Sequence, residues 1–338
     1  MRRLRLWALL LVLQLLALEF ILSIYFFQRR SEYPSALVHY AVFTYKRLTS
    51  TTRIESIGIY REDAKFGYRH RPNSTGIHRT DSFDVTYTIG NDGERPILAP
   101  REPLGRILFL GSSFTFGFGV KDNENYPYLL ATEHWAGWHV VNKAVSGWST
   151  VHAYMLLEEE LAKSVPPTIA IYNMIPDHIC RNYLRPAWLT MLAMSQRAHP
   201  HFELLEGKPV FQRVVTVTDA VQDEGTLRRK ELDLTAAFIG TMHKRAAEKN
   251  VRFIVVLLPQ RFDVACGPVA WPPSLVQSLT KQGVALLDLS ETKGQMQWLQ
   301  HDAHPNREGH RVLASTIARS FIGETLRDVA SRHGQQPR

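Results

Sequence analysis

Cysteine is scarce in this chain of 338 residues, which contains only Cys180 and Cys266. A disulfide-dense scaffold is therefore excluded. The two cysteines either form one disulfide in an oxidising compartment or pack as two small hydrophobic thiols. The 14 histidines show no metal-ligand spacing with cysteines or carboxylates, so the sequence predicts no metal and no cofactor.

The sequence also lacks long runs of one charge, internal repeats and low-complexity segments. Its formal net charge is +8 and its isoelectric point is near 9.5. The basic residues are interspersed with acidic ones, and no nucleic-acid-binding motif is present. We interpret the charge as a solvated surface and expect no nucleic acid partner. The length fits one large domain or two small ones, and the sequence leaves the oligomeric state open.

One long hydrophobic run stands apart from this pattern. It extends from Leu6 to Phe27 and is long enough to cross a bilayer as a helix. A cleaved signal peptide is the alternative, but the run exceeds a usual signal core and ends in basic residues without a cleavage site. We therefore predict a single-span anchor within residues 1–30, with the N-terminus cytoplasmic and the body in a periplasm or outside the cell.

The rest of the chain divides by its rhythm. Residues 31–104 form a β-rich preface, in which alternation from Phe83 to Ile89 and a following Gly-Asn-Asp-Gly turn predict a strand and then a hairpin. Residues 105–326 alternate apolar β-branched runs with amphipathic stretches, and residues 327–338 form a polar tail. This alternation predicts an α/β domain with a parallel sheet covered by helices on both faces.

Residues 181–230 interrupt the alternation and contain a predicted hairpin around Gly207. An insertion at the carboxyl end of a strand either caps a substrate pocket or is a decorative excursion.

The stretch Gly-Ser-Ser-Phe-Thr-Phe-Gly at residues 111–117 follows the first strand of this domain and precedes a helix expected near Asn125. It lacks the lysine of a phosphate-binding loop and the glycine spacing of a dinucleotide site. A serine at such a junction is exposed near backbone N–H groups and can be a nucleophile. The same residues could also form a simple turn.

A base for such a serine stands near the C-terminus. Asp302 precedes His304 by two residues, which places both side chains on one side of an extended loop. An aspartate beside a histidine fixes the tautomer of the ring and stabilises the imidazolium that forms when it takes a serine proton. Asn306 is a good N-cap for the helix that follows and would hold the histidine in a rigid corner.

These residues resemble the blocks of the SGNH (GDSL-type) hydrolase family, in particular its membrane-anchored bacterial members. The resemblance covers roughly residues 105–322. The family block Gly-Asp-Ser-x-x-x-Gly matches residues 111–117, so it implies that Ser113 is the nucleophile and that Ser112 replaces the usual aspartate. It further implies a three-layer αβα sandwich with a flavodoxin-like sheet, His304 and Asp302 as base and orienting acid, and oxyanion binding by the N–H groups of Ser113 and Gly147.

The third family block departs from the pattern. The family places an asparagine after the third strand to donate to the oxyanion, and Asp177 aligns with that place. An ionised aspartate cannot donate a hydrogen bond. Asn173, four residues earlier, and His178 are the alternative donors, although His178 could equally be a core or surface histidine.

The resemblance implies a serine esterase acting on O-acyl esters, with acetyl groups of an envelope or extracellular polysaccharide as the expected substrates. An O-acyltransferase could use the same residues. A non-catalytic relative that binds glycan or scaffolds an assembly is a third reading, because several family blocks are altered.

Overall fold

The computed structural model describes residues 7, 10–18, 58–80, 82–194, 197–221, 224–261, 270–300 and 302–326.

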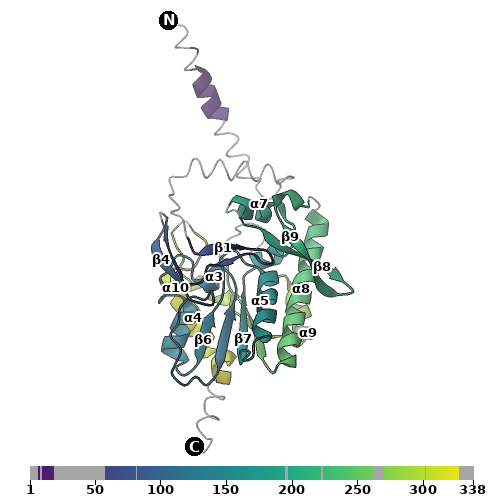
Figure 1. Ribbon diagram of the computed structural model, residues 1–338. Coiled ribbons are helices and arrows are strands. Elements are labelled where there is room, and N and C mark those ends of the chain that lie inside the picture. Colours follow the sequence, from purple (N-terminus) through teal and green to yellow (C-terminus); the bar gives the residue numbers. More distant parts are fainter. Residues whose placement is uncertain are drawn as a thin grey trace, which may run out of the picture.

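A five-stranded, fully parallel sheet lies at the centre of the molecule (Figure 1). Its order is β11-β10-β7-β5-β6, which is the flavodoxin-like order, and the predicted parallel sheet is confirmed. The order reverses between β5 and β7, so a crevice opens outside the carboxyl ends of these two strands. The strands are β5 (Arg106–Leu110), β6 (His139–Asn142), β7 (Ile169–Met174), β10 (Arg252–Leu257) and β11 (Ala285–Asp288).

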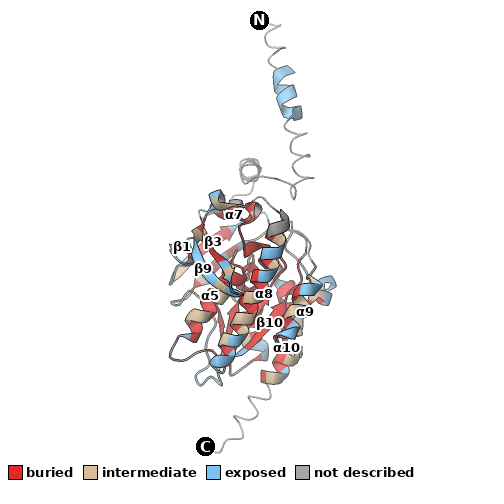
Figure 2. Cartoon of the chain, turned by 90° about the vertical axis from the view of Figure 1, so that its right-hand side faces the viewer, coloured by how far each residue is buried: buried red, intermediate tan, exposed pale blue. Residues whose placement is uncertain are grey.

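Helices cover both faces of the sheet, and the strands are apolar on both sides for that reason. Leu108 and Leu110 of β5 join the core beneath one helical layer, whereas Ile107 and Phe109 join the core beneath the other. Figure 2 shows buried residues on the strands and on the inner sides of the helices. The first layer comprises α5 (Thr150–Leu161), α8 (Glu224–Glu248) and α9 (Pro273–Lys281); the second comprises α4 (Tyr126–Leu129), the π-helix η1 (Leu130–His134) and α10 (Arg307–Arg319).

Two antiparallel hairpins form the described part of the preface. The predicted strand is present as β4, but the hairpin expected after it is wrong. β4 pairs with the strand before it, and after the turn at Gly90–Gly93 the chain makes one bridge, from Arg95 to Asn142. Three prolines between residues 96 and 103 lack the amide hydrogens that a further ladder needs. The hairpins are β1 (Tyr60–Asp63) with β2 (Gly67–His70) and β3 (Ser74–Arg79) with β4 (Asp84–Ile89).

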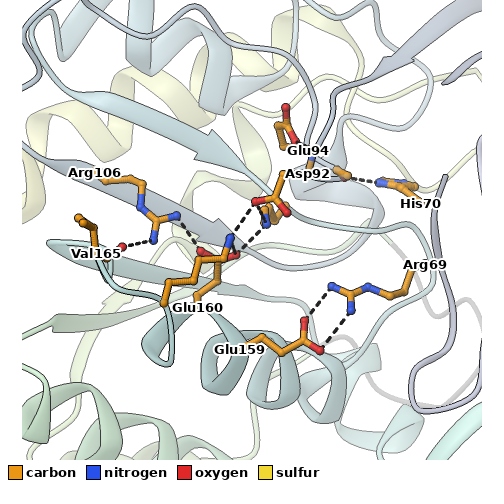
Figure 3. A network of polar contacts seen from close by, with 11 residues as sticks. Arg69, His70, Asp92, Glu94, Arg106, Glu159, Glu160 and Val165 are labelled. Atoms are coloured by element: carbon orange, nitrogen blue, oxygen red, sulfur yellow. Dashed lines mark hydrogen bonds and ion pairs between the residues drawn. The ribbon is translucent and has the colours of Figure 1, made fainter. Parts of the chain in front are cut away.

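Ion pairs attach the preface to the domain (Figure 3). Lys143, just after β6, donates to Asp92 of the preface at 2.5 Å and to Glu160 of α5 at 2.7 Å. Arg69 of β2 binds Glu159 of α5 with two hydrogen bonds, at 3.2 and 2.9 Å. Burial by itself raises the pKa of Glu160, but the charge of Lys143 and the hydrogen bonds from Lys143, Lys163 and Arg106 together outweigh it, and the pKa is lowered. The preface is thus fastened beside the end of β6.

The insertion after β7 contributes to the core. The predicted hairpin around Gly207 is confirmed, and both turn residues, Glu206 and Gly207, have positive φ angles of 52° and 74°, as its tight turn requires. Trp188 and Phe202 are buried in the same core as α5 and α8, so the insertion is not a decorative excursion. It follows α6 (Asp177–Arg181), and its elements are α7 (Pro186–Met194), β8 (His199–Leu205), β9 (Lys208–Val215) and the short η2 (Val217–Asp219).

The predicted anchor falls mostly outside the described residues. Trp7 and residues 10–18 are helical and exposed. Among the described residues, no helix combines the length and the apolar character needed to span a bilayer. The polar tail from residue 327 onward also lies outside the described part. Cys180 is disulfide-bonded, and Cys266 lies outside the described residues.

Candidate active site

Ser113 lies at the junction between β5 and the short helix α3 (Ser113–Phe116). The turn is tight, because a Cβ on Gly111 would come within 2.4 Å of the Thr115 hydroxyl oxygen. Gly117 ends the helix with a φ of 85°, and its N–H donates to the Ser113 carbonyl at 3.0 Å. The family glycines at both ends of the block thus have local structural reasons.

The structure brings Ser113, His304 and Asp302 together in one hydrogen-bonded chain. The Ser113 hydroxyl oxygen lies 2.7 Å from His304 Nε2, and His304 Nδ1 lies 2.5 Å from Asp302 Oδ1. The Asp302 carboxylate accepts from Nδ1–H, so the Nε2 lone pair faces the serine hydroxyl. Burial raises the pKa of Asp302, but the hydrogen bond and charge of the His304 ring, together with the backbone N–H groups of His304 and Ala303, outweigh it and lower the pKa, which keeps Asp302 ionised.

Contacts on both sides hold the loop that carries the histidine and the acid. Arg261, after β10, donates through Nη1 to the carbonyls of Leu299 at 3.1 Å and Asp302 at 2.9 Å. On the other side, Asn306 caps α10 by accepting from the N–H groups of the second and third helical residues at 3.0 Å each, which confirms the predicted N-cap. The histidine is therefore fixed between a capped helix and a bound loop.

Aromatic rings partly shield the His304 imidazole, whose side chain is 19% exposed. The Phe118 ring centroid lies 4.4 Å from it and that of Phe114 lies 5.2 Å away. His78 of β3 packs edge-on against Phe118 at 5.0 Å. Burial lowers the pKa of His78 to about 4, so this ring is neutral at pH 7. The preface therefore contributes an uncharged wall beside the base.

Gly147 lies in the loop after β6 with a φ of 86°. The N–H of Val145, two residues earlier, donates to the Gly111 carbonyl at 3.3 Å, which holds this loop beside the nucleophile turn. The Tyr68 hydroxyl donates to the Ser146 carbonyl at 3.0 Å. In the described part of the chain, neither the Ser113 N–H nor the Gly147 N–H donates to a protein acceptor. An N–H group without a protein acceptor can donate to the oxyanion of a bound substrate.

The structure does not place Asn173 as an oxyanion donor. It lies within β7, and its side-chain amide donates to the carbonyls of Leu110 and Ile171 at 3.2 Å each. Asp177 is also committed, since its carboxylate accepts from Arg181 and Gln260 at 3.1 Å each. Asn173 lies within a strand and its amide bonds to backbone carbonyls, and the Asp177 carboxylate accepts hydrogen bonds rather than donating them. Neither residue therefore supplies the third oxyanion donor that the family resemblance implies.

Comparisons with known proteins find similarity to solved structures at low sequence identity. No family model matches the chain, and no curated protein matches it. Solved structures similar to it include a putative G-D-S-L family lipolytic protein from Desulfitobacterium hafniense (15% identity, TM-score 0.37), covering 63% of this chain and 98% of that one. The esterase EstA from Pseudoalteromonas sp. (13%, TM-score 0.39) covers 65% and 98%. The acetyl xylan esterase AlAXEase (11%, TM-score 0.41) covers 63% and 97%. Similarity at this level does not assign a function, which has to follow from the site itself.

Several residues that shape the site carry no signal in the sequence. Arg261, Gln260 and Arg181 look like ordinary polar residues until the fold brings them to the Asp302 loop or to Asp177. His78 lies in the preface, far from the catalytic blocks in sequence. His178 is fully buried, and its Nε2 atom lies 2.7 Å from the Ser112 hydroxyl oxygen, so the ring packs against the nucleophile turn. Within the described ranges, no three metal-ligating side chains gather into a metal site.

Proposed function

We propose that the protein is a serine ester hydrolase of the SGNH type. The observation that carries the proposal is the chain from the Ser113 hydroxyl through His304 to the ionised Asp302, with contacts of 2.7 and 2.5 Å. A hydroxyl, an imidazole of fixed tautomer and an ionised, partly buried carboxylate in this order constitute an activated nucleophile.

The reaction follows from these contacts. Ser113 Oγ attacks the ester carbonyl while its proton passes to His304 Nε2, and Asp302 stabilises the imidazolium. The N–H groups of Ser113 and Gly147 donate hydrogen bonds to the negatively charged oxygen of the tetrahedral intermediate. His304 then protonates the leaving alcohol, and an acyl-serine remains. Water, deprotonated by His304, attacks the acyl group and releases the acid and the free serine.

We further propose that the substrates are O-acyl esters, namely acetyl groups of an envelope or extracellular polysaccharide. This part rests on the resemblance of the sequence blocks to those of anchored SGNH proteins. The hydrophobic run from residue 6 to residue 27 supports an N-terminal anchor with the domain on the periplasmic or outer side of a membrane. A sugar hydroxyl in place of water would make the same residues an O-acyltransferase.

The test is covalent labelling of the full-length protein with a fluorophosphonate, followed by peptide mass spectrometry. We expect an adduct on Ser113 that is absent in Ser113→Ala, strongly reduced in His304→Gln and present in Ser112→Ala. Unlabelled Ser113 in folded protein, at probe levels that label a known serine esterase, contradicts the proposal.

Acetate release from an acetylated oligosaccharide then separates the reactions. Acetate formed in proportion to the deacetylated sugar indicates hydrolysis, and acetyl groups recovered on an added sugar acceptor indicate transfer. Glycan binding without turnover and unaffected by Ser113→Ala indicates a binding module instead.

A further inference from the structure

The two adjacent serines of the nucleophile turn each bind a different histidine. Ser113 binds His304 on one side, and Ser112 binds Nε2 of His178 at 2.7 Å on the other. The second chain continues, because His178 Nδ1 lies 2.8 Å from the Tyr172 hydroxyl, which donates to Thr150 Oγ1 at 2.9 Å. It therefore joins the turn after β5 to α6, β7 and α5.

The direction of the bonds in this second chain follows from its far end. The Tyr172 hydroxyl has one hydrogen and donates it to Thr150, so it accepts from His178 Nδ1–H. A neutral imidazole with its hydrogen on Nδ1 has its lone pair on Nε2, so it accepts from the Ser112 hydroxyl. The only hydrogen of the Ser112 hydroxyl is thus used, and it does not serve as the missing third oxyanion donor.

The Ser112–His178 pair is more deeply buried than the Ser113–His304 pair, and this changes the chemistry of its histidine. Ser112 is 1% exposed, and His178 and Tyr172 are fully buried. The groups facing His178 are the Tyr172 hydroxyl, the Arg181 guanidinium and the neutral His152 ring. Burial first, and then the Arg181 charge, hold the pKa of His178 well below its usual value, so this ring is a poor base. Ser112 is consequently not a second nucleophile.

The second chain instead fixes the peptide group between the two serines. The turn is held from one side by Val145 N–H, which donates to the Gly111 carbonyl at 3.3 Å. It is held from the other side by the bond from the Ser112 hydroxyl to His178. The peptide whose N–H belongs to Ser113 leaves the Ser112 Cα that these two bonds hold, and its carbonyl, that of Ser112, accepts from the Phe116 N–H at 2.8 Å. The amide of Asn173 and the carboxylate of Asp177 are both committed, so among the described residues we take the Ser113 N–H and the one of Gly147 as the oxyanion donors.

We infer that Ser112 and His178 are positioning residues that aim the Ser113 N–H at the oxyanion, with Tyr172 fixing the tautomer of His178. The inference rests on the proposed ester hydrolysis and deepens it, because it assigns the second serine and the second histidine a role in the same site. A donor of this kind matters in the transition state and hardly in the ground state, where the carbonyl oxygen carries little charge.

Steady-state kinetics of the full-length protein on 4-nitrophenyl acetate test the inference. Removing a whole oxyanion donor lowers kcat about 100- to 1000-fold, so a misdirected one should lower it by about 10- to 100-fold. We expect this loss in Ser112→Ala, with KM within about twofold of the wild type. The factor by which Ser112→Ala lowers kcat should be the same at every pH, because His304 remains the base.

Variants of the histidine separate positioning from folding. His178→Gln keeps an acceptor for the Ser112 hydroxyl and should retain most of kcat, whereas His178→Leu should match Ser112→Ala. The control is Thr235→Val on α8, which removes a buried hydroxyl that Asn182 donates to at 2.7 Å, away from the nucleophile turn. It should change the melting temperature without changing kcat.

Each outcome decides between the claims. An active wild type with unchanged kcat in Ser112→Ala overturns the inference and leaves the proposed hydrolysis intact. The inference is also overturned if Thr235→Val and Ser112→Ala show the same fall in kcat for the same loss of melting temperature. A wild type that neither turns over nor labels at Ser113 overturns the proposed function, and the inference with it.

Discussion

Replacing Gly147 by alanine tests the oxyanion site most directly. The positive φ of 86° costs a non-glycine residue roughly 1–2 kcal/mol. The new Cβ would stand 2.5 Å from the Tyr68 hydroxyl oxygen, so the tyrosine must move and its bond to the Ser146 carbonyl, worth about 1 kcal/mol, weakens. We expect Gly147→Ala to lower the free energy of unfolding by about 2–3 kcal/mol.

The same change should displace the Gly147 N–H and lower kcat about 100- to 1000-fold, with a much smaller change in KM. Urea unfolding and initial rates measure the two effects. Tyr68→Phe is the matched partner, because it removes the hydroxyl that the new methyl meets. The double variant should be less destabilised than the sum of the single variants by about 1 kcal/mol. Wild-type kcat in a folded Gly147→Ala protein would refute the role of this N–H, and additive destabilisation would refute the contact.

The remaining predictions concern the acid, the preface and the disulfide. Asp302→Asn should keep the fold and lower kcat on the order of 10⁴-fold, measured on the same ester, because the amide no longer fixes the Nδ1–H tautomer; a loss below tenfold would contradict the assignment. Glu160→Gln removes a carboxylate that pairs with the buried Lys143. It should lower the free energy of unfolding, measured in urea at pH 7, by roughly 3 kcal/mol. Since the folded-state pKa of Glu160 is lowered, this difference is present above the unfolded pKa of about 4.3 and is lost as the pH falls through the folded pKa; a difference that persists undiminished in acid would speak against the ion pair. Reduction should lower the melting temperature, since Cys180 is disulfide-bonded beside Arg181, and an unchanged value would show that the bridge does not stabilise the site.

The sheet could be predicted from the sequence because its signals are local. Each strand is a short run of apolar residues ending at a glycine, proline or polar residue, and the alternation with amphipathic stretches determines that the strands run parallel. The N-cap at Asn306 and the turn at Glu206–Gly207 are local as well. Features that depend on a few consecutive residues can be predicted because tertiary contacts do not change them.

The pairing of the preface and the donors of the site could not be predicted in this way. β4 has the same alternation whichever neighbour it pairs with, and only the prolines after Gly93 hint that the following segment forms no ladder. Asn173 has the right chemistry for an oxyanion donor, but its amide is taken by two carbonyls, one of them on the adjacent strand. Such competition becomes visible only when the strands are placed side by side.

The positions at which this sequence departs from the SGNH blocks that it resembles can be explained together by the charges around the proposed oxyanion site. An aspartate at the position of Ser112 would place a second carboxylate, 1% exposed, next to the developing negative charge and against the neutral His178. Serine keeps the hydrogen bond without that charge. The carboxylate that does stand in this crevice, Asp177, is paired with Arg181, so its field is largely cancelled. The carboxylate that contacts the histidine of the proposed triad is that of Asp302, which in the proposed reaction stabilises the imidazolium from the side of His304 that faces away from Ser113.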